Sequence, residues 1–140
     1  MEHVTSEDLS LQIRSAHRLI AAYYQRLIPT LNNISHDLDI DFYCWVPSEF
    51  DSPCRLTSDI TKKWQWDLLP GISTRYLYKS FENAQKAKIG EYLIEFFVIS
   101  DTGVLKENDP RNHRSQPDAI SLALPVERAE SVLRIQLYTP

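Results

Sequence analysis

The segment YLIEFFVIS, residues 92–100, decides the fold class of the chain. In an extended strand, successive side chains point to opposite faces, and here both faces are apolar: Tyr92, Ile94, Phe96 and Val98 on one, Leu93, Phe97 and Ile99 on the other. A strand that is apolar on both faces is typical of the middle of a sheet, where both faces are covered. The segment therefore predicts a central strand, with Glu95 as an acidic residue held among apolar neighbours.

Other segments predict the strands around this one. Residues 40–46 and 132–138 alternate apolar and polar side chains. Residues 60–69 and 72–81 predict the two arms of a hairpin, joined by Pro70 and Gly71 in a type II turn. Residues 118–124 are compatible with either a short helix or a strand. The pattern predicts a mainly antiparallel sheet of about five strands.

A long helix precedes the strands. Thr5 and Ser6 are good N-cap residues, and the acids Glu7 and Asp8 follow in the first turn, where the helix dipole favours them. Apolar residues then recur every three or four positions from Leu9 to Leu38, as on one face of a helix. Pro29 interrupts this stripe, so we expect a helix over residues 6–28, a kink or break, and a shorter segment to residue 36. The prediction is one α+β domain, residues 1–140, with the helix packed on the sheet.

Composition limits the class of protein. The chain has 140 residues and 16.3 kDa, of which 43% are hydrophobic and 11% aromatic, enough for the core of one domain. Two cysteines are too few for a disulfide scaffold, and the first residues do not resemble a signal peptide. No apolar run approaches the roughly 20 residues that span a bilayer. We expect a cytoplasmic protein.

Charge indicates which partners are favourable. The formal net charge is −4. Residues 37–59 contain six acids and one base, Arg55, so this segment has five net negative charges. Duplex nucleic acid and anionic membranes repel such a surface, whereas a protein with a basic surface is attracted to it.

No motif for catalysis, a metal or a cofactor emerges. Cys44 and Cys54 are ten residues apart, without the paired spacing of a zinc site or a histidine at ligand spacing. Cys44 is in phase with Ile40, Phe42 and Val46, which predicts an inward, packing role. The Asp-Thr-Gly sequence at residues 101–103 resembles the catalytic signature of aspartic proteases, but the segments that such a fold needs downstream are missing, so we interpret it as a turn after a strand.

The sequence best fits a small protein-interaction domain of the inhibitor, immunity or adaptor type. The predicted binding surface is acidic and aromatic and comprises Tyr43, Trp45, Glu49, Phe50, Asp51, Trp64 and Trp66. Tyr43 and Trp45 are expected to point away from Cys44. A homodimer is also compatible with the sequence. One alternative is a small enzyme or ligand-binding domain with a helix–sheet pocket around Glu95. A weaker one is single-stranded nucleic-acid binding by a hairpin that displays Trp64, Trp66, Tyr76 and Tyr78.

Overall fold

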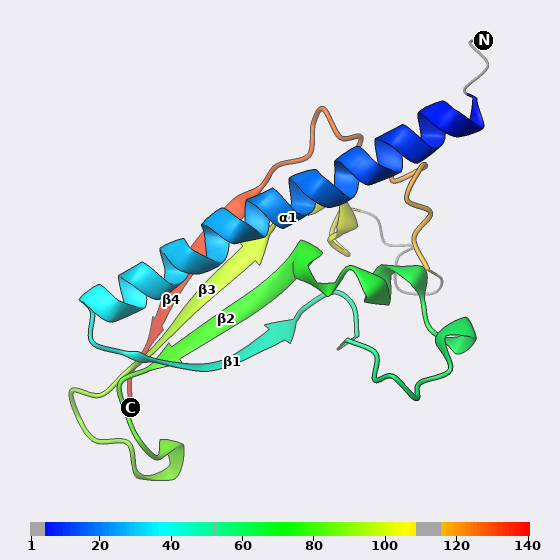
Figure 1. Ribbon diagram of the computed structural model, residues 1–140. Coiled ribbons are helices and arrows are strands. Elements are labelled where there is room, and N and C mark those ends of the chain that lie inside the picture. The colour runs from blue at the N-terminus through cyan, green and yellow to red at the C-terminus, as the bar shows by residue number, and fades with distance from the viewer. Residues whose placement is uncertain (1–4, 52, 109–115) are drawn as a thin grey trace. The chain divides into compact units, whose positions relative to one another are not determined.

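The protein has an α+β fold, as predicted, with one long N-terminal helix and a four-stranded antiparallel sheet (Figure 1). The computed structural model describes residues 5–51, 53–108 and 116–140. Its contacts divide the chain into two compact units, Met1–Asp39 and Ile40–Pro140. The first unit contains the helix and the second contains the sheet.

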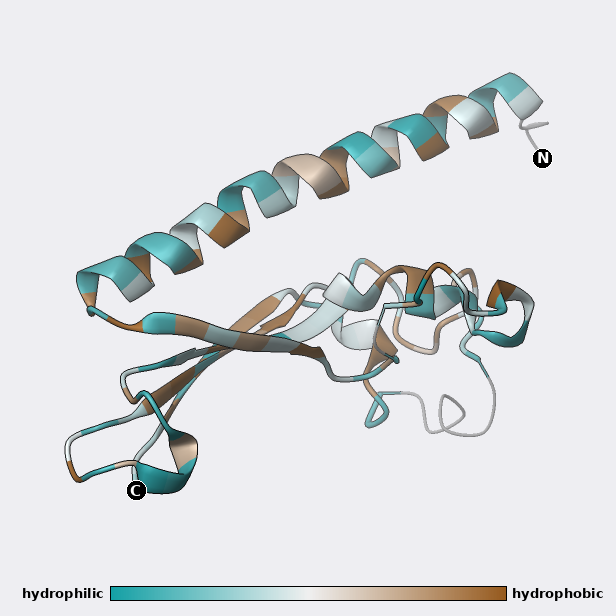
Figure 2. Cartoon of the chain, turned by 60° about the horizontal axis from the view of Figure 1, so that its bottom comes forward, coloured by the Kyte–Doolittle hydropathy of each residue, from teal (hydrophilic) through white to brown (hydrophobic). Residues whose placement is uncertain are grey.

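Helix α1, Ser6–Asp37, begins at a capping box. The Thr5 hydroxyl accepts from the Asp8 backbone N–H at 3.2 Å, and the Asp8 carboxylate accepts from the Thr5 N–H at 3.2 Å. The Thr5 hydroxyl also donates to the Asp8 carboxylate at 2.6 Å, and this bond, together with the one from the Thr5 N–H, holds the pKa of Asp8 below its usual value. At the other end, Asp39 has a φ of 53° and turns the chain out of the helix. Apolar bands recur along the ribbon of α1 (Figure 2).

A kink or a break was predicted at Pro29, and the break is wrong, because α1 continues through this residue without interruption. A proline in a helix removes one backbone donor and crowds the carbonyl four residues earlier. The next turn is supported by the Thr30 hydroxyl, which donates to the Arg26 carbonyl at 2.7 Å. The helix thus continues although Pro29 lacks a backbone donor.

The sheet contains β1 (Asp41–Pro47), β2 (Ser73–Lys79), β3 (Leu93–Ile99) and β4 (Val132–Tyr138), in that order and all antiparallel. Strand β3 pairs with β2 on one side and β4 on the other, and its residues 94–99 are all buried. The prediction of a central strand covered on both faces is confirmed.

The first arm of the predicted hairpin does not form. Residues 60–69 instead contain the 3-10 turns Ile60–Lys62 and Gln65–Leu68, and a third turn, Pro70–Ile72, replaces the expected type II turn. Side chains satisfy the backbone locally: Asp59 accepts from the Thr61 N–H at 3.1 Å, and Asp67 from the Trp64 N–H at 3.2 Å. Such bonds compete with a strand ladder. The described part of the chain therefore has four strands instead of about five.

Three other predictions, for segments outside the sheet, had different outcomes. Residues 118–124 form neither the helix nor the strand considered, but a series of turns. The first turn is held by Asp118, whose carboxylate accepts from the Ile120 N–H at 3.0 Å. Most of the charged loop predicted at residues 106–116 lies outside the described residues. The Asp-Thr-Gly sequence is a turn, as predicted, in which Asp101 accepts from the Gly103 N–H at 2.8 Å.

A β-bulge in β1 changes which side chains share a face. Phe42 pairs with Tyr78, but Cys44 already pairs with Leu77, so Tyr43 is an extra residue without a partner on β2. Side chains of paired residues lie on the same face. Phe42 is therefore on the face of Tyr78, whereas Cys44 is on the opposite one. The prediction that these two residues are in phase is wrong, because a period of two cannot anticipate an inserted residue.

The two faces of the sheet differ in chemistry. On one face, the Tyr78 ring meets Phe96 edge-on at 5.7 Å between centroids and Phe42 at 5.6 Å. On the other, the Arg75 and Arg134 guanidinium groups lie 4.8 and 5.5 Å from the centroid of the Phe97 ring. This ring is thus flanked from both neighbouring strands, and the arginine stems help to bury it.

Candidate binding pocket at Trp66

The buried carboxylate of Asp67 organises the loop that follows β1. One oxygen accepts from the Asp51 backbone N–H at 3.0 Å, and the other accepts from the Trp64 N–H at 3.2 Å. Hydrogen bonds from backbone N–H groups to an ionised acceptor are among the stronger kinds in proteins. Asp67 therefore fixes two parts of the loop, around residues 51 and 64, against each other.

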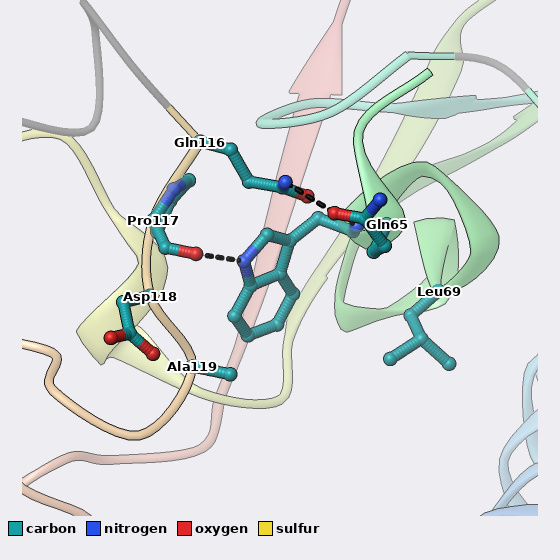
Figure 3. A pocket seen from close by; sticks show the side chains of 7 residues that line it. Gln65, Leu69, Gln116, Pro117, Asp118 and Ala119 are labelled. Carbon is teal, nitrogen blue, oxygen red and sulfur yellow. Dashed lines mark hydrogen bonds between the residues drawn. The ribbon is translucent and has the colours of Figure 1, made fainter. Parts of the chain in front are cut away.

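The indole of Trp66 is held from both sides. Its ring stacks on Phe50, with centroids 5.2 Å apart and planes 8° from parallel. Its Nε1–H donates to the Pro117 carbonyl at 2.8 Å, across 51 residues of sequence (Figure 3). The Trp66 backbone N–H donates to the Gln116 side chain at 3.3 Å, and the Gln116 amide is hydrogen-bonded to Gln65. The ring is thus pre-positioned instead of being free to rotate.

These contacts border an open pocket of about 460 Å³. Its lining residues come from two segments far apart in sequence: Gln65, Trp66, Leu69, Gln116, Pro117, Asp118 and Ala119 (Figure 3). A volume of this size is ordinary for a ligand or anchor site in a protein, as is a mainly apolar lining with a few oriented polar groups. Asp118 is the one charged residue among the seven, so the lining carries a negative charge and no positive one.

Two acids of the segment 37–59 have local hydrogen-bond and lysine partners. The Asp51 carboxylate accepts from the Lys63 ammonium at 3.2 Å, and this hydrogen bond raises the pKa of Lys63. The Thr61 hydroxyl and backbone N–H donate to Asp59 and lower the pKa of that carboxyl, while Lys62 lies 3.7 Å from it. Lysine side chains therefore offset part of the negative charge that the count of acids over residues 37–59 suggests. Asp37 and Asp39 belong to the helical unit.

The structure brings together part of the predicted binding surface. Phe50 and Trp66 are in contact, and Asp51 and Trp64 share the Asp67 carboxylate through their backbones. Glu49 lies on the same loop and is half-buried.

Tyr43 and Trp45 lie in different surroundings. The Tyr43 ring meets Phe81 edge-on at 6.2 Å, and the Lys79 ammonium lies 5.6 Å from its centroid. Trp45 pairs with Tyr76, on the face opposite to Lys79. The two rings were expected on one face, and the bulge at Tyr43 separates them. Trp45 does point away from Cys44, as predicted.

Sequence reasoning missed most of the pocket lining. Leu69 was assigned to a strand, and residues 116–119 were assigned to an exposed loop and to an element of undecided type. No local signal distinguishes Pro117 as the acceptor for Trp66, because that contact depends on how two remote loops fold together.

The geometry required by the two alternative functions is only partly present. Glu95 is buried, at 7% exposure, with its carboxylate 3.9 Å from Nε of Arg75, but it does not line the pocket at Trp66. Tyr76 and Tyr78 are 8% and 4% exposed, so they are not available for stacking. Trp64 and Trp66 lie on turns instead of on a neighbouring strand. The four rings therefore do not form one platform.

The fold and the pocket define an α+β protein with a preformed apolar pocket beside an antiparallel sheet. A family model labelled PM0109 matches residues 4–140, and the chain belongs to this family. Searches of curated proteins and of solved structures gave no match. Within the described residues, no helix is both long and apolar enough to cross a bilayer.

Proposed function

We propose that this protein is a small protein-interaction module, without catalytic activity, that receives an apolar side chain of its partner in the pocket at Trp66. The observation that carries the proposal is the fixed indole, stacked on Phe50 and hydrogen-bonded to Pro117. Interfaces between proteins are dominated by a few anchor residues that enter well-packed pockets. A pocket whose walls are already positioned loses less entropy when the anchor binds.

The charge around the pocket indicates the chemistry of the partner. Asp118 lines the pocket, and Glu49 lies on the loop that carries Phe50, whereas Asp51 on the same loop is already paired with Lys63. A partner segment with an aromatic or aliphatic anchor next to lysine or arginine complements this arrangement. An inhibitor, an immunity protein and an adaptor would all bind a partner protein in this way. A cytoplasmic location, predicted from the low cysteine content, belongs to the proposal as well.

An enzymatic role for this pocket has less support. Acid–base catalysis needs titratable groups positioned around the reacting atoms. The lining offers one such group, Asp118, whose carboxylate already accepts from the Ile120 N–H. Glu95 pairs with Arg75 elsewhere on the sheet.

Filling the pocket tests the proposal directly. Ala119→Trp places an indole where Ala119 lines the pocket and removes no hydrogen bond made by a side chain. We expect peptides selected from a random display library on the wild-type protein to share an apolar anchor flanked by basic residues. Binding of these peptides, measured by fluorescence anisotropy, should be lost in Ala119→Trp and retained in the control Ala84→Trp, which places the same ring on the exposed turn Ala84–Lys86.

The Asp118→Asn variant separates charge from shape. An asparagine can still accept from the Ile120 N–H, so the turn is maintained while the negative charge is removed. Peptide affinity should fall less than in Ala119→Trp and should become less dependent on salt. Selected peptides that bind Ala119→Trp as tightly as the wild type would contradict the proposal, as would a selection that enriches no common anchor.

A further inference from the structure

Strand β4 is an edge of the sheet with an exposed apolar face. Among the described residues it pairs with β3 alone, and it stands at the border of the sheet (Figure 1). Its alternate residues Leu133, Ile135 and Leu137 share one face and are 50%, 60% and 59% exposed. An edge strand with unpaired backbone groups is a template for another strand.

The opposite edge is built differently. Strand β1 contains the bulge at Tyr43 and ends at Pro47, which has no backbone N–H. Bulges and prolines are devices that prevent an edge strand from pairing with another chain. Strand β4 has neither device: its register with β3 is regular through all seven residues, and it contains no proline. The two edges thus differ in their capacity to accept another strand.

We infer that β4 pairs antiparallel with β4 of a second copy of this chain, about a two-fold axis at Ile135. A two-fold axis perpendicular to the sheet keeps every side chain on its own face, and residues that lie opposite each other across two antiparallel strands must share a face. One residue of the strand must therefore lie opposite its own copy, with the axis midway between the two. With Ile135 on the axis, Leu133 lies opposite Leu137 of the other copy, and Val132 opposite Tyr138. All seven residues of the strand are then paired, and the two sheets form one continuous sheet.

The side chains of β4 favour this register over its neighbours. The only charged residue of the strand, Arg134, lies opposite Gln136 of the other copy, whose amide oxygen can accept from the guanidinium. An axis at Arg134 would place two arginines opposite each other, which is unfavourable. An axis at Gln136 would leave Leu133 beyond the end of the paired strand. The axis at Ile135 also brings the apolar triplets Leu133, Ile135 and Leu137 of both copies side by side on one face.

Crosslinking tests the register. In a background with Cys44→Ala and Cys54→Ser, Ile135→Cys should place the two thiols directly opposite each other across the axis. The matched control, Leu133→Cys, separates them by four residues, about 13 Å along the strands. A thiol-specific crosslinker with a spacer much shorter than this offset should give a covalent dimer with Ile135→Cys but not with Leu133→Cys. A mixture of the Leu133→Cys and Leu137→Cys proteins should crosslink between the two.

Analytical sedimentation tests whether the protein forms a dimer through β4. The wild-type protein should sediment as a dimer that dissociates on dilution, and Ile135→Lys should be monomeric because it places two ammonium groups opposite each other on the axis. Ile135 is largely exposed in one copy, so its replacement should leave the circular dichroism spectrum unchanged. A wild-type protein that is monomeric at every concentration would overturn the inference. A dimer that persists in Ile135→Lys, or efficient crosslinking of Leu133→Cys to itself, would also overturn it.

Discussion

At the scale of single residues, a few polar groups hold the loops of this protein. Asp67 is buried, yet it satisfies two backbone donors from different parts of one loop. The Pro117 carbonyl does the same for the Trp66 indole. A buried polar group that is paired contributes little net stability, but leaving its partners without a bond is costly. Asp67 and Pro117 therefore position the loops that form the pocket.

Replacing Asp67 with alanine should destabilise the protein. The change leaves the Asp51 and Trp64 N–H groups without their acceptor, and the expected loss in the free energy of unfolding is about 1–3 kcal/mol, as for other buried groups that lose a partner. Asp67→Asn should lose less, because one amide oxygen remains. Urea unfolding followed by tryptophan fluorescence gives both values. Asp59→Ala, which removes an exposed carboxylate from a similar turn, is the control, and an equal loss there would contradict the prediction.

At the scale of elements, a single irregular residue affects a helix and a strand differently. The capping box at Thr5 and Asp8 begins α1 where the sequence indicates. Pro29, which was expected to kink or break the helix, lacks a backbone donor and does not stop it. In β1, by contrast, a single extra residue at Tyr43 reverses the face on which the following side chains lie. A strand is therefore more sensitive to one inserted residue than this helix is to one proline.

Removing the proline should stabilise α1. Pro29 is exposed and lies inside the helix, and proline is about 3 kcal/mol less favourable than alanine in a helix interior. Pro29→Ala should raise the free energy of unfolding, followed by far-ultraviolet circular dichroism, by up to about this amount. Pro29→Gly should gain about 1 kcal/mol less, because glycine is the poorer helix former of the two. A loss of stability in both variants would show that Pro29 has a role that the helix geometry does not reveal.

At the scale of the whole molecule, burial is greatest in the middle of the sheet. Strand β3 has a strand on each side, and its residues 94–99 are buried. Among the described residues, strand β1 pairs with a strand on one side only, and it carries the bulge. In α1, residues 6–22 are all exposed. Regions with few buried contacts open more readily than the core.

Hydrogen exchange should therefore differ strongly along the chain. We expect the amides of β3 to exchange most slowly, at a rate set by global unfolding, and those of β1 to exchange faster. The first half of α1 should exchange faster than β3 as well. Mass spectrometry of peptides from the intact protein measures all three regions in one experiment. Protection in β1 equal to that in β3 would contradict the role of β3 as the centre of the core.

The elements that were predicted correctly have strong local patterns. Strand β4 follows from the alternation of apolar and polar residues, β3 follows from its two apolar faces, and the start of α1 follows from Thr5 and Asp8. Residues 60–69 were misassigned because their apolar and aromatic content resembles a strand, whereas Asp59 and Asp67 bind the local backbone and favour turns. Of the predicted site, Phe50 and Trp66 do lie together, but the other wall of the pocket was missed.

The sequence by itself determined the fold class, the central strand and the capped helix, because periodicity and capping are interactions among neighbours in the chain. Tertiary structure alone decided the face on which Cys44 and Trp45 lie, since that depends on a bulge in the pairing of two strands. It also decided the pocket, because the hydrogen bond from Trp66 to Pro117 joins residues 51 positions apart. No local pattern encodes a contact at that separation, and it forms only when the loops fold against each other.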